Sequence, residues 1–298
     1  MKAQLPDELK QDVPQTTWGK LLTATPIIMT VVATALAGLA SSEMTRAQYA
    51  RSLAAQQQSK VGDQWSFFQA KRLRGSLSRS TLDLLQTTAD VRPLNADTLA
   101  KFAPAPDDAT AAALQKAELP PVPAGLELIP EVKSALALLE ASKPDSEITA
   151  VLAKVNEETL TDSVRTARNR ADAFDTATRP IIQGMDRLEK SLAGADRDRV
   201  RDFTAARLRF TAARYDAEAR LNQTVAQLIE MQVRESNFTA DRHNRRSQRF
   251  FFGMLAAQAA VVISTFSIAA QKRSMLWTLA AAAGLAAVGF AAYVYFFV

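Results

Sequence analysis

The chain has 298 residues, with 36 Lys and Arg against 31 Asp and Glu, a net charge of +5, no cysteine and a single histidine, His243. These counts exclude disulfides, thiol catalysis, zinc–thiolate sites and any metal site built from several histidines. Outside one cluster near residue 245, acidic and basic residues are interspersed. Nucleic-acid binding needs a concentrated basic patch, so no nucleic-acid partner is expected.

Three uncharged stretches are each long enough to cross a bilayer core of about 30 Å as a helix. They are residues 21–42, 250–271 and 274–298. The polar residues 1–20 are expected to be loose or to lie at the membrane interface. The first stretch is interpreted as a retained span, because it is too long for the core of a cleaved signal peptide. The sequence therefore predicts a multi-pass membrane protein with a large insertion between spans one and two.

Small and polar residues within the spans are candidates for helix packing in lipid. Small residues four positions apart let two helix backbones approach closely, and an amide in a span often bonds across to another helix. These candidate span-packing residues are Ala33, Ala37, Gly38, Ser42 and Gln258.

The insertion begins with a stretch without proline, residues 43–90. Its apolar residues recur at helical spacing, which predicts a long stalk helix that continues out of the first span. Residues 91–195 form the expected cap, because prolines up to Pro144 permit only loops and short helices, such as 109–117 and 131–141. A disordered linker is the alternative for the proline-rich part.

A second helical part of the cap, residues 145–193, is expected to be interrupted near Pro180 and to end near Gly194. Residues 196–249 then return as a second long stalk helix whose apolar residues recur every three or four positions, a coiled-coil-like pattern. The predicted fold is an all-α membrane protein. It has three transmembrane helices, a long helical, coiled-coil-like stalk, and a helical, proline-rich cap inserted between spans one and two.

The most distinctive short segment is Asp63–Lys71. Its aromatic and polar side chains would be neighbours on one helix at spacings of three and four. The segment is a candidate interaction surface, and the alternative is ordinary helix packing with a local charge pair. The residues of this candidate surface are Asp63, Gln64, Trp65, Phe68, Gln69 and Lys71.

This segment, about 20 residues after a first span, resembles the bacterial membrane family known as domain of unknown function 4337. The similarity extends to a basic stretch, residues 243–249, and to a two-span hairpin with Lys272, Arg273 and Trp277 in matching places. It covers roughly residues 20–80 and 240–298 and leaves the middle of the chain without an obvious match. The resemblance implies the bacterial inner membrane and this architecture, but no activity.

Four arginines precede the second span, and they are candidates for contact with anionic lipid headgroups. They are Arg242, Arg245, Arg246 and Arg249. Cations near a membrane surface are attracted by about 1 kcal/mol each. The simpler role is topological anchoring, and both roles can coexist. His243, which lies among these arginines, is expected to be an interfacial cation or a solvated neutral ring.

Three spans place residues 1–20 and the Lys272–Arg273 turn on one side of the membrane. The large insertion and the C-terminus lie on the other side, with Arg46, Arg51 and the four arginines close to the span ends. The opposite side has Lys10, Lys20, Lys272 and Arg273. The positive-inside rule weakly favours a cytoplasmic location for the large insertion and the C-terminus, because long loops count for little in that rule.

No catalytic motif, phosphate-binding loop or metal-binding motif occurs in the sequence, so neither catalysis nor a cofactor is expected. The leading hypothesis is a homo-oligomeric, membrane-anchored scaffold, because two long amphipathic helices alone bury their apolar faces poorly. A sensor or regulator that acts through an unidentified protein partner is one alternative. An oligomeric channel or transport component is another, although the spans lack the ionisable residues that usually mark ion pathways.

Overall fold

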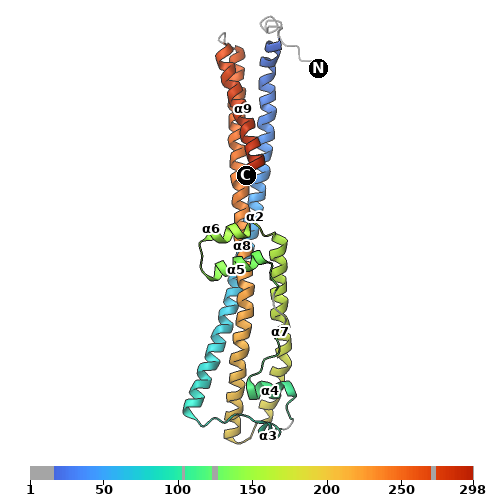
Figure 1. Cartoon of the computed structure of the whole chain (residues 1–298), viewed down its shortest axis with the longest axis vertical. Helices are drawn as coiled ribbons and strands as arrows, with labels where there is room; N and C mark the ends of the chain where they lie inside the picture. The colour runs from blue at the N-terminus through green and yellow to red at the C-terminus, as the bar shows by residue number, and fades with distance from the viewer. Residues whose placement is uncertain (1–16, 103–104, 123–126, 270–272, 298) are drawn as a thin grey trace. The chain divides into compact units, whose positions relative to one another are not determined.

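The computed structural model describes residues 17–102, 105–122, 127–269 and 273–297. Within these ranges the chain forms eight α-helices and no strand (Figure 1). The helices are α2 (Thr17–Thr88), α3 (Ala96–Leu99), α4 (Asp108–Lys116), α5 (Pro130–Glu140), α6 (Asp145–Leu152), α7 (Glu157–Ser191), α8 (Arg197–Ala269) and α9 (Arg273–Phe297). The predicted all-α class is confirmed.

Two compact units divide the chain. The first unit contains Met1–Leu53 and Ser236–Val298, and the second contains Ala54–Glu235. The helices α2 and α8 each contribute residues to both units. Three helices, α2, α8 and α9, each contain an apolar window long enough to cross a membrane, which confirms the three predicted candidate spans.

The helix α8 and residues 43–88 of α2 lie in stretches without proline, while Pro26 lies inside the spanning part of α2. The helix α2 runs from Thr17 to Thr88, as expected for a first span that continues into a long helix. The short helices predicted at 109–117 and 131–141 are confirmed as α4 and α5. Gly194, with φ +87°, takes the left-handed conformation that separates α7 from α8, as expected.

The predicted interruption near Pro180 is wrong, because Pro180 lies inside the continuous helix α7. A proline in a helix removes one hydrogen-bond donor and crowds the preceding turn. Here the turns around it are fixed by packing. Ile181, Met185 and Leu188 are all buried in one apolar cluster with α4 and α8. Burial of an amphipathic face contributes more to helix stability than local propensity does.

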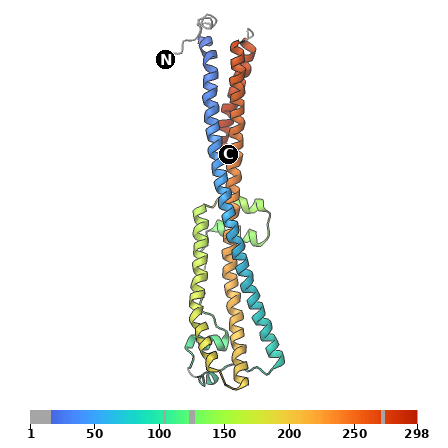
Figure 2. The ribbon, with the colours of Figure 1, turned by 180° about the vertical axis from the view of Figure 1, so that it is seen from behind.

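In the second unit α8 lies between α2 and α7 (Figures 1 and 2). One apolar cluster joins α5, α6 and the start of α7 to residues 225–233 of α8. The other joins α3, α4 and the end of α7 to residues 203–210. The loop before α4 is ordered by an N-cap, since Asp107 Oδ1 accepts a hydrogen bond from the Thr110 backbone N at 2.8 Å. This bond lowers the pKa of the Asp107 carboxyl, against the opposing effect of burial.

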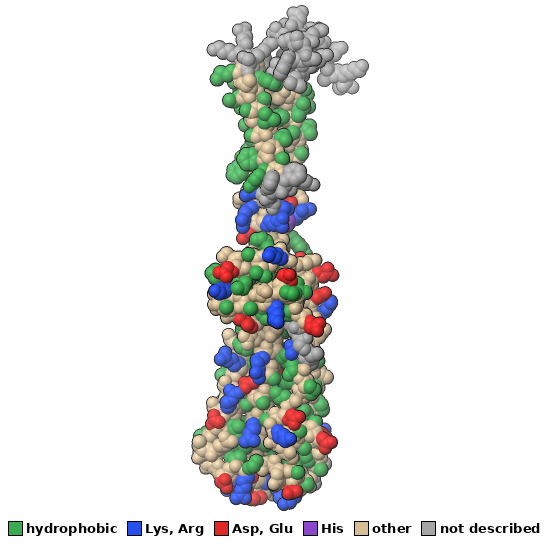
Figure 3. Space-filling model, in the orientation of Figure 1, with side chains coloured by type: hydrophobic (Ala, Val, Ile, Leu, Met, Phe, Trp, Pro, Cys, Tyr) green, Lys and Arg blue, Asp and Glu red, His purple; other side chains and the backbone are tan. Residues whose placement is uncertain are grey.

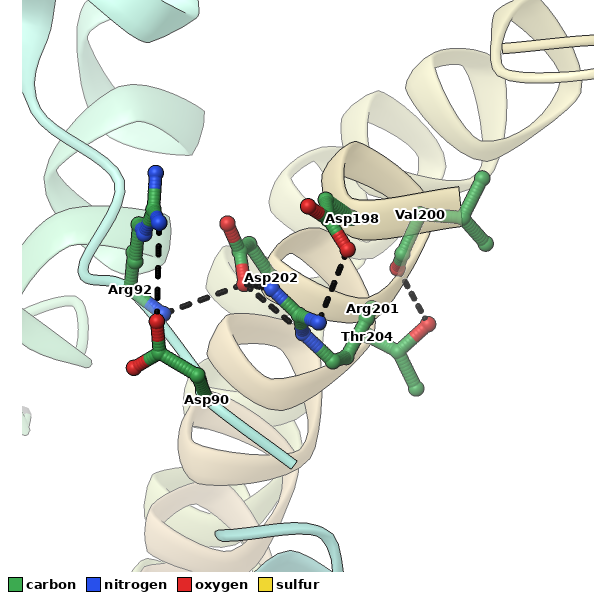
Figure 4. A network of polar contacts seen from close by, with 7 residues as sticks. All are labelled: Asp90, Arg92, Asp198, Val200, Arg201, Asp202 and Thr204. Carbon is green, nitrogen blue, oxygen red and sulfur yellow. Dashed lines mark hydrogen bonds and ion pairs between the residues drawn. The ribbon is translucent and has the colours of Figure 1, made fainter. Parts of the chain in front are cut away.

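A polar network joins the chain after α2 to the start of α8 (Figure 4). Asp202 Oδ1 accepts hydrogen bonds from the Arg92 backbone N at 3.0 Å and from the Arg201 guanidinium at 3.3 Å. Arg201 also donates to Asp198 at 2.9 Å. Asp202 is largely buried, so it anchors the connection from α2 onto α8 within the second unit.

The first unit is a bundle of those parts of α2, α8 and α9 that are long and apolar enough to cross a membrane. Small side chains dominate its buried interior, including Ala33, Ala40, Ala257 and Ala287. A Cβ on Gly253 would meet Leu36 at 3.3 Å and the Ala287 carbonyl at 3.5 Å. Small residues at these crossings let the three helix backbones approach closely, as expected for helices packed in lipid.

Candidate functional site

The segment Asp63–Lys71 of α2 contacts α8 through a polar seam in the second unit. Gln64 Nε2 donates to Asn222 Oδ1 at 2.8 Å. Lys71 Nζ lies 2.5 Å from Glu218 Oε2, and the two side chains are only 16% and 5% exposed. The Lys71 ammonium also lies 4.9 Å from the centre of the Phe67 ring. The seam is therefore a buried, charge-assisted contact between two long helices.

Glu218 is the centre of this seam. Its second carboxylate oxygen lies 3.5 Å from Arg214 Nε, so one buried carboxylate compensates two cations. Gly75 brings the two helices close, because a Cβ there would lie 3.1 Å from Asp216 Oδ1. Asp216 in turn accepts a hydrogen bond from Arg79. Along the seam, charged pairs therefore lie on both sides of Gly75, where the backbones of α2 and α8 come close.

The residues of the predicted interaction surface separate onto two sides of α2. The structure brings together Gln64, Trp65, Phe68 and Lys71 towards the interior of the second unit, while Asp63 and Gln69 are exposed. The Trp65 and Phe68 rings meet edge to face, with centroids 5.4 Å apart. Trp65 also packs against the apolar cluster formed with α5 to α8.

Sequence reasoning missed the partners of this segment. Asn222 and Glu218 lie 158 and 147 positions away from Gln64 and Lys71. A local signal was Glu218 itself, a carboxylate that lies between two alanines, Ala217 and Ala219.

A cavity of about 650 Å³ opens beside Trp65 in the second unit. Its walls come from α2, from the α5–α6 connection and from one face of α8. The lining residues are Trp65, Leu139, Glu140, Ser142, Lys143, Ile148, Gln223, Gln227, Glu230 and Arg234.

Charged side chains on the cavity wall are partly paired. The Arg234 guanidinium donates to Glu230 Oε1 at 2.8 Å and to Asp145. Burial alone would lower the pKa of Arg234, but these hydrogen bonds outweigh it and raise the pKa above its usual value. Gln227 donates to Glu140 at 3.3 Å. Mixed charge beside an aromatic wall suits a small amphipathic ligand.

In the first unit, basic side chains gather where the apolar surface of the spans ends (Figure 3). Of the predicted lipid contacts, Arg242 and Arg245 are exposed, while Arg246 and Arg249 are partly buried. The Arg249 guanidinium lies 5.2 Å from the centre of the Tyr293 ring of α9. The four arginines therefore lie close together on α8, next to the first exposed aromatic residues of the span.

His243 is paired rather than solvated. Its Nδ1 lies 2.6 Å from Glu43 Oε2, and the two side chains are 19% and 12% exposed. Ser247, one turn further along α8, donates to the Ala40 carbonyl at 2.8 Å. These two contacts join α2 and α8 at the membrane boundary of the first unit.

The predicted span-packing residues fall into a buried group and an exposed group. Ala33 is buried and Ala37 is half-buried, so both lie towards the other spans. Gly38 and Ser42 are exposed, and a Cβ on Gly38 would meet nothing within 4 Å. Gln258 is exposed as well. Within one chain these last three residues do not pack, so their predicted role needs a second molecule.

Comparison with protein families gives one result that bears on identity. A family model described as "Domain of unknown function (DUF4337)" matches residues 22–179. The match includes the proline-rich middle of the chain, which lay outside the resemblance seen in the sequence. It ends before residues 240–298, the hairpin that the resemblance had included. Curated proteins and solved structures gave no match. Because the matched residues make up more than half of the chain, the protein belongs to the family of the domain of unknown function DUF4337.

Proposed function

We propose that the protein is a membrane-anchored, homo-oligomeric scaffold without catalytic activity of its own. In this proposal α2 and α8 form a coiled-coil-like stalk, and the proline-rich segment with α7 forms its cap. The membrane is the bacterial inner membrane. The arginines near the span ends support a cytoplasmic location for the second unit and the C-terminus.

The spacing of buried residues along α2 supports the coiled-coil-like stalk. In the second unit its buried and half-buried positions alternate between steps of three and four, the pattern that places side chains in a helix–helix seam. The positions in this pattern are Ala54, Gln57, Val61, Gln64, Phe68, Lys71, Gly75, Ser78, Leu82 and Leu85, and Trp65, next to Gln64, is half-buried as well. This seam is already occupied by contacts within the chain.

The observation that carries the proposal is a second stripe on the opposite side of α2. Leu73, Leu77 and Leu84 are 70%, 65% and 64% exposed. The stripe also follows steps of three and four, and none of its members is charged. Its residues are Ser66, Ala70, Leu73, Leu77, Ser80, Leu84 and Thr87. Four of its seven members are apolar, namely Ala70, Leu73, Leu77 and Leu84. Exposed apolar residues gathered on one helix face mark interaction surfaces.

A second copy of the chain is the occupant that the stripe favours. Copies held in one bilayer share an orientation and lose less freedom on association than free molecules do. The absence of charge along the stripe removes the repulsion that self-association would otherwise meet. Identical subunits usually close into symmetric assemblies, and the exposed Gly38, Ser42 and Gln258 offer contacts between spans of different copies.

Photo-cross-linking in intact membranes tests the occupant directly. A benzophenone side chain placed at Leu77 should yield a product of two copies of this chain, identified by peptide mass. The same group at Gln58, exposed on another side of α2, is the control and should yield far less. Cross-links from position 77 to a different protein, or yields equal to the control, would contradict the proposal.

The cavity beside Trp65 favours a second candidate function, that of a membrane sensor or regulator. Its mixed polar and aromatic lining could hold a small molecule, and the response would have to pass to a partner protein. A partner recovered in equal amounts with the extracted protein would favour this function over the scaffold. The channel alternative gains no comparable support from the described residues.

A further inference from the structure

We propose that the arginines at the start of the second span form a binding site for the phosphate group of an anionic phospholipid. The site consists of Arg242, Arg245, Arg246 and Arg249, on α8 in the first unit. It does not depend on the scaffold function, because it concerns the contact of one chain with the bilayer.

The charge balance at this boundary leaves cations uncompensated. Residues 41–53 and 238–252 contain six arginines and two carboxylates, Glu43 and Asp241. Both carboxylates are already occupied within the chain. Glu43 contacts His243 at 2.6 Å and Arg46 at 3.4 Å, and Asp241 lies 3.7 Å from Arg51.

Three of the arginines are therefore available to an acceptor from outside the chain. Arg245, Arg246 and Arg249 form no ion pair with any described residue. The Nε of Arg246 is buried and has no hydrogen-bond partner among the described residues. A buried donor without an acceptor is costly, and a phosphate oxygen is a strong acceptor for a guanidinium.

The geometry of α8 aligns these cations with an apolar surface. Arg242, Arg245 and Arg249 are three and four positions apart and share one helix face. Phe252, the next residue on that face, is 57% exposed, and uncharged residues continue beyond it. Guanidiniums followed by an exposed aromatic and an apolar surface match a lipid, with a headgroup phosphate above and an acyl chain below.

The neighbouring helix holds one guanidinium in place. The Arg249 guanidinium lies over the Tyr293 ring of α9, with 5.2 Å between its central carbon and the ring centre. Beside it, Gly253 packs closely against Phe290. Contacts that fix a side chain reduce the conformational entropy lost when a ligand binds. A headgroup site needs guanidinium N–H donors that are held in a fixed orientation, whereas topological anchoring needs only positive charge.

Native mass spectrometry of the detergent-extracted full-length chain tests the site. The protein is titrated with phosphatidylglycerol or with phosphatidylcholine, and the dissociation constants of the lipid adducts are compared. The wild type should prefer phosphatidylglycerol. The variant R245Q/R246Q/R249Q should lose about fivefold in affinity for each arginine removed, while its affinity for phosphatidylcholine should change little.

The control variant R72Q/R74Q/R168Q removes the same charge from exposed positions in the second unit and should keep the preference. Equal binding of phosphatidylglycerol by R245Q/R246Q/R249Q and this control would overturn the proposal. So would a fully retained preference in R245K/R246K/R249K, which keeps the charge and loses the guanidinium fork. Inorganic phosphate should not displace the lipid at millimolar concentration, and displacement would assign the site to a soluble anion instead.

Discussion

Replacing Glu218 by glutamine should lower the free energy of unfolding of the second unit by about 3 kcal/mol or more. The reason is that Lys71 and Arg214, which are 16% and 15% exposed, would lose the one carboxylate that both contact. Removing one partner of a buried ion pair leaves an uncompensated charge in a poorly solvated place, which typically costs about 3–5 kcal/mol. Native-state hydrogen exchange of α2 around Lys71 and of α8 around Glu218 measures the loss.

The matched control removes a carboxylate from an exposed pair. Asp162 and Arg165 are 2.8 Å apart, but their side chains are 53% and 69% exposed. Asp162→Asn should therefore cost less than about 1 kcal/mol. The double variant K71M/E218Q should recover part of the loss caused by E218Q, because one of the two stranded cations is removed. If E218Q costs no more than Asp162→Asn, the seam between α2 and α8 does not stabilise the second unit.

Replacing Gly184 by alanine should destabilise the packing of α4 on α7 by about 1–3 kcal/mol. A Cβ at position 184 would overlap Thr110 Oγ1 and lie 3.1 Å from its Cγ2 and 3.3 Å from its Cβ. Thr110 is fully buried, and any rotation of its branched side chain moves another atom into the same space. Two measurements test this loss: the thermal unfolding temperature of the full chain, and the rate of native-state hydrogen exchange in α4.

The matched control for the substitution at Gly184 is the replacement of Gly62 by alanine. It lies in the middle of α2, and a Cβ there would meet nothing within 4 Å. Gly62→Ala should therefore raise the free energy of unfolding by roughly 0.5–1 kcal/mol, since alanine is the better helix former. The variant T110A/G184A should recover most of the loss, because the overlapping atoms are gone. Equal effects of the two glycine substitutions would contradict the close approach of α4 and α7.

The spans and most helices could be predicted because their signals are local. Apolar stretches, proline-free stretches and the glycine at position 194 each act on their own neighbourhood. Pro180 shows where local reasoning fails, because burial of Ile181 and Met185 on the same helix outweighs the cost of the proline.

The candidate sites were predictable only in part, because their partners are set by the register between distant helices. The segment around Trp65 was recognised as unusual, but nothing local identifies Glu218 or Asn222 as its partners. In the same way His243 looks solvated beside its arginine neighbours, yet it pairs with Glu43, which lies 200 positions away. If the sequence of α8 were shifted by one position, Glu218, Asn222 and His243 would each rotate by about 100° around the helix axis, away from their partners on α2.

The native mass of the complex tests the central claim, that the exposed stripe of α2 is covered by a second copy. The protein is extracted into nanodiscs, and its mass is measured by light scattering. The wild type and the control Q58E/Q86E, which adds two charges elsewhere on α2, should form one discrete oligomer. The variant L73E/L77E should fall to the monomer, because two charges would then lie within the stripe. A wild-type monomer, or an oligomer that L73E/L77E leaves intact, would contradict the account.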